Sequence, residues 1–184
     1  MVRSSRDLDL PIISNRRTNP VNLITYRKIQ QEDNPFIANV IRKALEEFGV
    51  ARPGTVYTDP TTDALFELFN RADSVYWIAE CDTQIVGGCG IFPTDGLPEG
   101  YAELVKLYVD VEFRNAGLGY TLMEHSIQSA EELGYTHLYL ETLPELNKAI
   151  TLYERMGFQK IAHALGASGH FACDLWMTRK IKTD

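Results

Sequence analysis

The fold of this chain is decided by the stretch Arg114-Asn115-Ala116-Gly117-Leu118-Gly119. A run typical of a strand, 104–111, precedes it, and a run typical of a helix, 120–133, follows it. The first turn of a helix carries N–H groups that lack carbonyl partners, together with the positive end of the helix dipole. A glycine-rich turn between a strand and a helix is therefore typical of a phosphate site built from backbone N–H groups.

The glycines of this stretch are compatible with a simple turn as well as with a phosphate site. A GxG pair in a loop suits either, and these residues alone do not separate the two. The pattern GxxxxGK[ST] is absent, which excludes a P-loop. GxGxxG with an acidic residue about 20 positions later is also absent, which argues against a dinucleotide-binding fold.

Composition and charge limit the class of protein. The chain has 184 residues, of which 45% are hydrophobic and 23% charged, as expected for one globular domain. No apolar run approaches the roughly 18 residues of a membrane helix, and no signal peptide is recognisable. The net charge is −7, and the absence of a basic cluster argues against nucleic acid as a partner. The acidic surface either favours a cationic substrate such as an amine or serves only solubility.

The cysteines and histidines show no pattern of a disulfide or a metal site. Cys81, Cys89 and Cys173 are odd in number and have no CxxC spacing, which predicts a reducing cytoplasm without disulfides. The four histidines have no metal-ligand spacing, so we expect no metal; they are His125, His137, His163 and His170.

Hydrophobic periodicity predicts a sheet with several helices. The expected strands are 23–29, 75–80, 84–92, 101–111, 136–142, 159–163 and 171–179. The expected helices are 34–48, 62–70, 117–133 and 146–156. This order predicts an α/β (α+β) fold, with a mixed central sheet of about six to seven strands, helices on both faces and a parallel strand–helix–strand unit over 101–142. We expect a polar N-terminal arm over 1–21 and a single domain over 22–184.

Two ordered motifs resemble those of a known family. The pattern Val109-x4-Arg114-x2-Gly117-x-Gly119 resembles the pyrophosphate-binding motif of the GNAT acyltransferase superfamily. The pattern Asn147-x2-Ile150-x-Leu152-Tyr153-x3-Gly157-Phe158 resembles the second motif of that family. In the first motif, Asn115-Ala116 replaces the usual glycine or basic residue, which weakens phosphate contacts only slightly. The tail 164–173 is similar to that of a bacterial YjgM-like branch.

This resemblance implies the GNAT acyl-CoA N-acyltransferase fold and the function of an N-acetyltransferase. Acetyl-CoA would be the co-substrate, and the acetyl group would pass to a primary amine by direct attack in a ternary complex. The expected partner is a small-molecule amine, with no nucleic acid and no membrane, and a homodimer is left open. The alternatives are a non-catalytic acyl-CoA-binding module, a protein-amine acetyltransferase and a scaffold that binds through its N-terminal arm.

The resemblance also implies where the donor binds. Strands 101–111 and 136–142 would separate to admit the pantetheine arm, and the Val109 N–H would point at the thioester oxygen. Asn147 would either cap its helix or bind the pantetheine. The expected donor-binding residues are Leu107, Tyr108, Val109, Arg114, Asn115, Ala116, Gly117, Leu118, Gly119, Tyr120, Thr121 and Asn147.

Glu103 and Tyr153 are the expected catalytic residues. Alternation along the strand places Glu103 on one face with Val105, Leu107 and Val109, where partial desolvation would raise its pKa and suit it as the general base. The alternative is an exposed carboxylate at the rim.

Three further residues complete the expected chemistry. Tyr153 would donate to the leaving thiolate, and the alternative is a core tyrosine packed on Phe158. Glu141 is the second candidate base, and His170 would contact the substrate, act as a base or be a polar residue of a hairpin.

Overall fold

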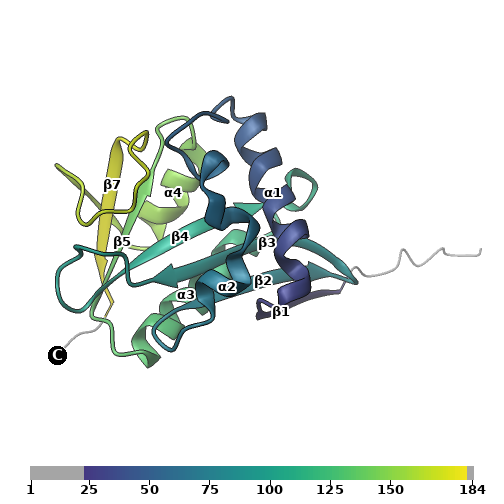
Figure 1. Cartoon of the computed structure of the whole chain (residues 1–184), viewed down its shortest axis with the longest axis horizontal. Helices are drawn as coiled ribbons and strands as arrows, with labels where there is room; N and C mark the ends of the chain where they lie inside the picture. The colour runs from purple at the N-terminus through teal and green to yellow at the C-terminus, as the bar shows by residue number, and fades with distance from the viewer. Residues whose placement is uncertain (1–22, 182–184) are drawn as a thin grey trace, which may run out of the picture.

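The computed structural model describes residues 23–181, which form one seven-stranded sheet (Figure 1). Its strands are β1 Ile24–Lys28, β2 Val75–Cys81, β3 Gln84–Phe92, β4 Tyr101–Val109, β5 His137–Thr142, β6 Gln159–Ile161 and β7 Leu175–Lys180. Its α-helices are α1 Asn34–Glu47, α2 Leu65–Phe69, α3 Leu118–Glu132 and α4 Asn147–Arg155. The predicted arm 1–21 lies outside the described residues.

The strand order is β1-β2-β3-β4-β5-β7-β6. Among the strands of residues 23–181, only β4 and β5 pair in parallel, and every other pair is antiparallel. Helix α3 connects the two parallel strands, as a crossover between parallel neighbours requires. The predicted mixed sheet and its parallel unit are therefore confirmed.

Helices cover both faces of the sheet and create two hydrophobic cores (Figure 1). Side chains of α3 and α4 fill the first core, which includes Leu122, Met123, Tyr153 and Met156. Side chains of α1 and α2 fill the second core, which includes Ile37, Ile41, Leu45 and Leu65. The two cores hold the central strands between them. No helix within residues 23–181 is long and apolar enough to cross a membrane.

Four predicted elements begin or end two or more residues away from their position in the structure, and one of them is the strand expected over 159–163, which ends at Ile161. The helix expected over 62–70 is an α-helix only from Leu65, because Asp59 accepts from the Thr61 N–H and Pro60 begins a 3₁₀ turn over 60–63. The strand expected over 101–111 ends at Val109 and continues as a 3₁₀ turn over 111–113. The last strand begins at Leu175 instead of 171, after a segment that turns repeatedly.

Candidate active site

Strands β4 and β5 diverge in the middle of the sheet. Their parallel pairing runs from Tyr101 opposite His137 to Glu103 opposite Tyr139 and then ends. The remaining residues of β4 stay paired with β3 alone. The expected separation of these two strands is therefore present, and it leaves backbone groups of β4 free to pair with a ligand.

A β-bulge at Lys106 reverses the faces of β4. Lys106 has a left-handed φ of 52°, and the register with β3 shifts between Gly88 and Gly90. Val105 therefore packs in the second core, whereas Leu107 and Val109 pack in the first. The prediction that Glu103 shares one face with Leu107 and Val109 was wrong, because strict alternation does not survive the extra residue of a bulge.

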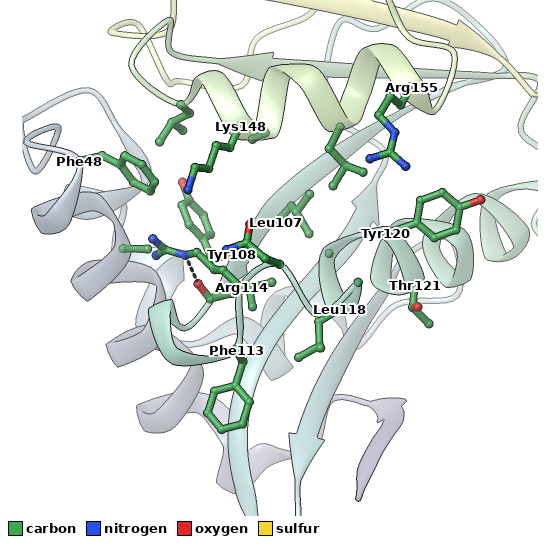
Figure 2. Close-up of a pocket in the computed structure, with 18 residues that line it drawn as sticks. Phe48, Leu107, Tyr108, Phe113, Arg114, Leu118, Tyr120, Thr121, Lys148 and Arg155 are labelled. Atoms are coloured by element: carbon green, nitrogen blue, oxygen red, sulfur yellow. Dashed lines mark hydrogen bonds between the residues drawn. The ribbon is translucent and has the colours of Figure 1, made fainter. Parts of the chain in front are cut away.

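A cavity of about 630 Å³ opens between the end of β4, the glycine turn and α4 (Figure 2). Its size is that of sites for cofactors and drug-sized ligands. Most of the predicted donor-binding residues line it; these are Leu107, Tyr108, Val109, Arg114, Asn115, Gly117, Leu118, Gly119, Tyr120 and Thr121.

The glycine turn gives this cavity an anion-binding end. Gly117 precedes α3 with a φ of 85°, which glycine adopts without steric cost, and Asn115 is also left-handed. The Thr121 N–H donates to the Gly117 carbonyl at 3.1 Å. The N–H groups of Leu118, Gly119 and Tyr120 precede this bond and have no carbonyl one helical turn before them. Together with the helix dipole they suit a phosphate group.

The Arg114 side chain is fixed by contacts within the protein and is not a mobile phosphate ligand. Its Nε donates to the Val109 carbonyl at 2.9 Å, and its Nη2 lies 2.8 Å from a carboxylate oxygen of Glu47. The guanidinium also stacks 5.0 Å from the ring centre of Phe48. Arg114 thus fixes the turn to β4 and α1, which positions the N–H groups.

Helix α4 supplies the opposite wall, and it does so with residues that the sequence analysis missed. Figure 2 shows Lys148 and Arg155 extending from α4 toward the cavity, and Leu152 lies between them in sequence. Their spacing of four and three residues places them on one helical face, so helix periodicity could have identified them. Both cations are suited to an anionic ligand.

Two of the predicted donor-binding residues do not line the cavity: Ala116 and Asn147. Asn147 is the first residue of α4 and is exposed, and the N-cap is Leu146, where no side-chain hydrogen bond caps the helix. The interpretation of Asn147 as the cap was therefore wrong.

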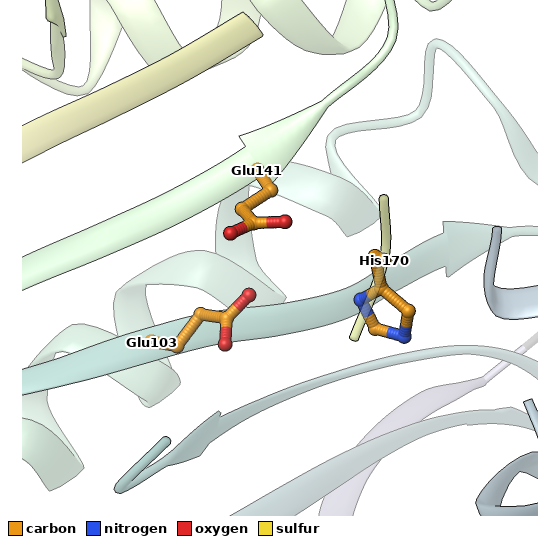
Figure 3. A group of neighbouring side chains, drawn as sticks. All are labelled: Glu103, Glu141 and His170. Carbon is orange, nitrogen blue, oxygen red and sulfur yellow. The ribbon is translucent and has the colours of Figure 1, made fainter. Parts of the chain in front are cut away.

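A second, smaller cavity of about 50 Å³ lies in the gap between β4 and β5 and shares Leu107, Tyr108 and Leu146 with the first. Glu103, Glu141 and His170 all line it, and their ligand-type atoms lie within 4.8 Å of one another (Figure 3). The structure thus brings three predicted residues together from β4, β5 and the loop before β7. Such a group suits an ammonium ion, and it also has the composition of a metal site, so the expected absence of a metal stays a prediction.

Glu103 is buried and its proton is held more tightly than usual. Its side chain is only 3% exposed, and Thr94 Oγ1 donates a hydrogen bond to it. Burial raises the pKa of Glu103 to about 7, and the charge of Glu141 adds to this effect, although the Thr94 hydrogen bond opposes it. The alternative of an exposed carboxylate at the rim was wrong. A carboxyl group with this pKa exchanges protons readily at neutral pH.

The neighbouring carboxylate, Glu141, is fixed by two hydroxyl donors. Tyr139 donates to Glu141 Oε1 at 2.8 Å, and Ser168 donates to Glu141 Oε2 at 2.8 Å. The Tyr139 hydroxyl in turn accepts from the Leu165 N–H at 3.1 Å. Tyr139 therefore attaches the loop before β7, which also carries His170, to the sheet.

Tyr153 faces the same gap from α4. It lies in the first core, its ring centre is 6.1 Å from that of Phe158, and it lines the small cavity. Its hydroxyl has no hydrogen-bond partner within residues 23–181. Burial holds the pKa of Tyr153 well above its usual range, so the hydroxyl stays protonated and can donate to a ligand. A place in the core and a role as donor are thus compatible for this residue.

The comparisons with known proteins agree with this geometry. Residues 38–158 match the model of the acetyltransferase (GNAT) family. The chain is 38% identical over 156 residues to the uncharacterised N-acetyltransferase YjgM of Escherichia coli strain K12, and the match covers 84% of this chain and 93% of the relative.

Solved structures show the same fold. A GNAT acetyltransferase of Staphylococcus aureus Mu50 has a TM-score of 0.74 at 19% identity and covers 87% of this chain and 100% of its own. The PaiA N-acetyltransferase of Thermoplasma acidophilum, solved with coenzyme A, has a TM-score of 0.67 at 18% identity and covers 86% of this chain and 99% of its own. The chain therefore belongs to the acetyltransferase (GNAT) family and is a YjgM-like acyltransferase.

Proposed function

We propose that the protein transfers the acetyl group of acetyl-CoA to a primary amine of a small molecule, by direct attack in a ternary complex. One observation carries this proposal: a cavity with a phosphate-binding end meets a carboxylate-lined cavity where β4 and β5 separate. The first suits an acyl-CoA donor and the second an ammonium acceptor. A non-catalytic acyl-CoA-binding module would not need the second.

The donor would lie along β4. Its pyrophosphate would accept from the N–H groups at the start of α3, and Lys148 and Arg155 would face its negative charges. The Asp110 N–H donates to the Val86 carbonyl on β3, so the preceding N–H, that of Val109, points to the opposite edge of β4. This orientation supports a hydrogen bond from the Val109 N–H to the thioester oxygen, where negative charge develops.

Glu103 would prepare the acceptor. An ammonium ion has no lone pair, so it must lose a proton before attack, and Glu103 would take it directly or through one water. The neutral nitrogen then bonds to the acetyl carbon as the C–S bond breaks, and Tyr153 would donate to the leaving sulfur. Glu141 and His170 would hold the ammonium beside Glu103.

The acceptor cavity supports a small amine. At about 50 Å³ it has room for an amino group and the first atoms behind it. A protein amine on a long side chain is the alternative acceptor, and a transfer assay over small amines and peptides distinguishes the two. A cytoplasmic location remains part of the proposal and is supported by three unpaired cysteines.

Calorimetry with CoA tests the donor site directly. Gly117 and Gly134 have φ values of 85° and 87°, and an added Cβ meets nothing within 4 Å at either position. Gly117→Ala and Gly134→Ala therefore carry a similar backbone strain of about 1 kcal/mol. We expect only Gly117→Ala to weaken CoA binding, by tenfold or more. Gly119→Val, at a position without left-handed φ, should block binding in a folded protein. Normal CoA affinity in folded Gly119→Val would contradict the proposal.

A further inference from the structure

Thr142, the last residue of β5, carries a buried hydroxyl group without a partner. The residue is only 3% exposed, and its Oγ1 is the one side-chain nitrogen or oxygen between residues 23 and 181 that is fully shielded from solvent and makes no hydrogen bond. Buried hydroxyl groups in folded proteins are nearly always bonded, and an unbonded one opposes folding. An exception of this kind calls for a ligand that supplies the missing partner.

The position of Thr142 in the sheet shows which ligand could do so. Leu138 and Leu140 belong to the first core, so alternation places Thr142 on the same face, which α3 and α4 cover. Glu141 lies on the other face, toward the acceptor. Thr142 nevertheless lines the small cavity, together with Tyr153 from α4. Two hydroxyl groups that have no partner among residues 23–181 thus line one small cavity from the donor side of the gap.

We propose that the Thr142 hydroxyl donates a hydrogen bond to the sulfur of the acyl-CoA donor and, with Tyr153, stabilises the leaving thiolate. This inference rests on the proposed function. In the step concerned, the amine nitrogen bonds to the acetyl carbon, and the C–S bond breaks with its electron pair going to sulfur. One proton of the ammonium goes to Glu103 before attack. Tyr153 gives its proton to the sulfur, and the second proton, which the nitrogen loses as the amide forms, restores Tyr153. Thr142 keeps its proton throughout and only donates a hydrogen bond.

The chemistry of sulfur explains why this bond would favour the reaction. A thioester sulfur is a poor acceptor, whereas a thiolate is charged and accepts strongly. A donor aimed at sulfur therefore binds the transition state more tightly than the ground state, which is the condition for raising kcat. The thioester oxygen would have a separate donor on β4, the Val109 N–H. The oxygen would thus be bound from β4, and the sulfur from the side of the gap that Thr142 and Tyr153 line.

Calorimetry with CoA and desulfo-CoA tests the contact. Thr142→Val keeps the shape of the side chain and removes the hydroxyl, and Thr142→Ser keeps the hydroxyl. At alkaline pH, where more CoA is thiolate, we expect Thr142→Val to lose about tenfold in affinity for CoA and nothing for desulfo-CoA. Thr142→Ser should stay close to wild type. The kcat of Thr142→Val should fall by about tenfold with an unchanged KM for acetyl-CoA.

Thermal melting of the free protein gives a second readout. Thr142→Val should melt at the same temperature as wild type or above it, because the variant has no unsatisfied hydroxyl. An equal loss of affinity for CoA and desulfo-CoA would place the hydroxyl elsewhere on the donor and overturn the inference. Unchanged affinity for both would also overturn it. Failure of the wild-type protein to bind CoA would instead contradict the proposed function.

Discussion

The Lys106 ammonium lies 2.6 Å from a carboxylate oxygen of Asp59, and the Lys106 side chain is only 3% exposed. The same oxygen lies 3.3 Å from Nε2 of His170. One carboxylate thus joins the bulge of β4, the 3₁₀ segment after α1 and the loop before β7. Burial opposes ionisation of Asp59, but hydrogen bonds from His170 and Lys106 and the charge of Lys106 outweigh it, so the pKa of Asp59 lies well below its usual range.

Replacing Asp59 by Asn should destabilise the protein and loosen the acceptor site. The change leaves a buried ammonium without its counter-charge, which typically costs about 3–5 kcal/mol. We expect a loss of that order in the free energy of unfolding from urea titration, and a higher KM for the acceptor with unchanged CoA affinity. Asp63→Asn is the matched control, since Asp63 pairs with Arg42 at 2.6 Å but is 61% exposed and should cost under about 1 kcal/mol. Equal stability of the two variants would contradict the expected role of Asp59.

Replacing Glu103 by Gln should change the pH dependence of activity. With a pKa of about 7, wild-type Glu103 becomes a base as the pH rises, so kcat/KM should rise through about pH 7. Glu103→Gln removes this ionisation, and its defect should be largest near pH 6 and smallest near pH 9, where more of the amine is already neutral. Pre-steady-state and steady-state rates of wild type and Glu103→Gln between about pH 6 and pH 9 measure this defect.

Glu141→Gln is the matched control for this profile. It removes the neighbouring carboxylate but keeps the proposed base, so the ionisation should persist, at a somewhat lower pH because the charge of Glu141 no longer raises the pKa of Glu103. If Glu103→Gln equals wild type at low as well as high pH, the base lies elsewhere, and Glu141 and His170 are the next residues to test.

Glu103→Gln should also raise the free energy of unfolding at alkaline pH. The pKa of Glu103 is about 7 in the folded protein, against an ordinary value of 4.5. Below about pH 4.5 Glu103 is protonated in both the folded and the unfolded protein, so its burial does not lower the free energy of unfolding through ionisation. Between the two values only the unfolded state ionises, so wild-type stability falls as the pH rises, and the cost is complete above pH 7. Glu103→Gln should gain up to about 3 kcal/mol there and nothing near pH 4. A constant difference across this range would show that the pKa of Glu103 is not raised.

Tyr153→Phe should lower turnover and leave donor binding nearly unchanged. A general acid that assists a leaving group commonly contributes about 10²–10⁴ in rate. The hydroxyl has no protein partner among the described residues, so the melting temperature should stay within a degree or two of wild type. Steady-state kinetics with acetyl-CoA measures kcat and KM separately. Full activity of Tyr153→Phe at every pH would leave this residue with packing alone.

The sequence by itself determined the features that depend on neighbouring residues. A strand, a glycine turn and a helix in succession fix the direction of the N–H groups of Leu118 to Tyr120 wherever the unit lies in a fold. Hydrophobic periodicity determined the succession of strands and long helices along the chain. The two motifs then indicated the family, because both occur and in the expected order, about 30 residues apart.

Tertiary structure alone decided the features that depend on distant segments. Lys106 and Asp59 are 47 positions apart, and His170 and Asp59 are 111 apart, so no local pattern predicts their contact. The bulge at Lys106 reversed the faces of β4 because pairing with β3 adds one residue to one strand only. Thr142 acquired its unpartnered hydroxyl through burial in the gap that Tyr153 of α4 also lines. Backbone direction is a local property of the chain, whereas burial, charge pairing and pKa arise only when distant segments pack together.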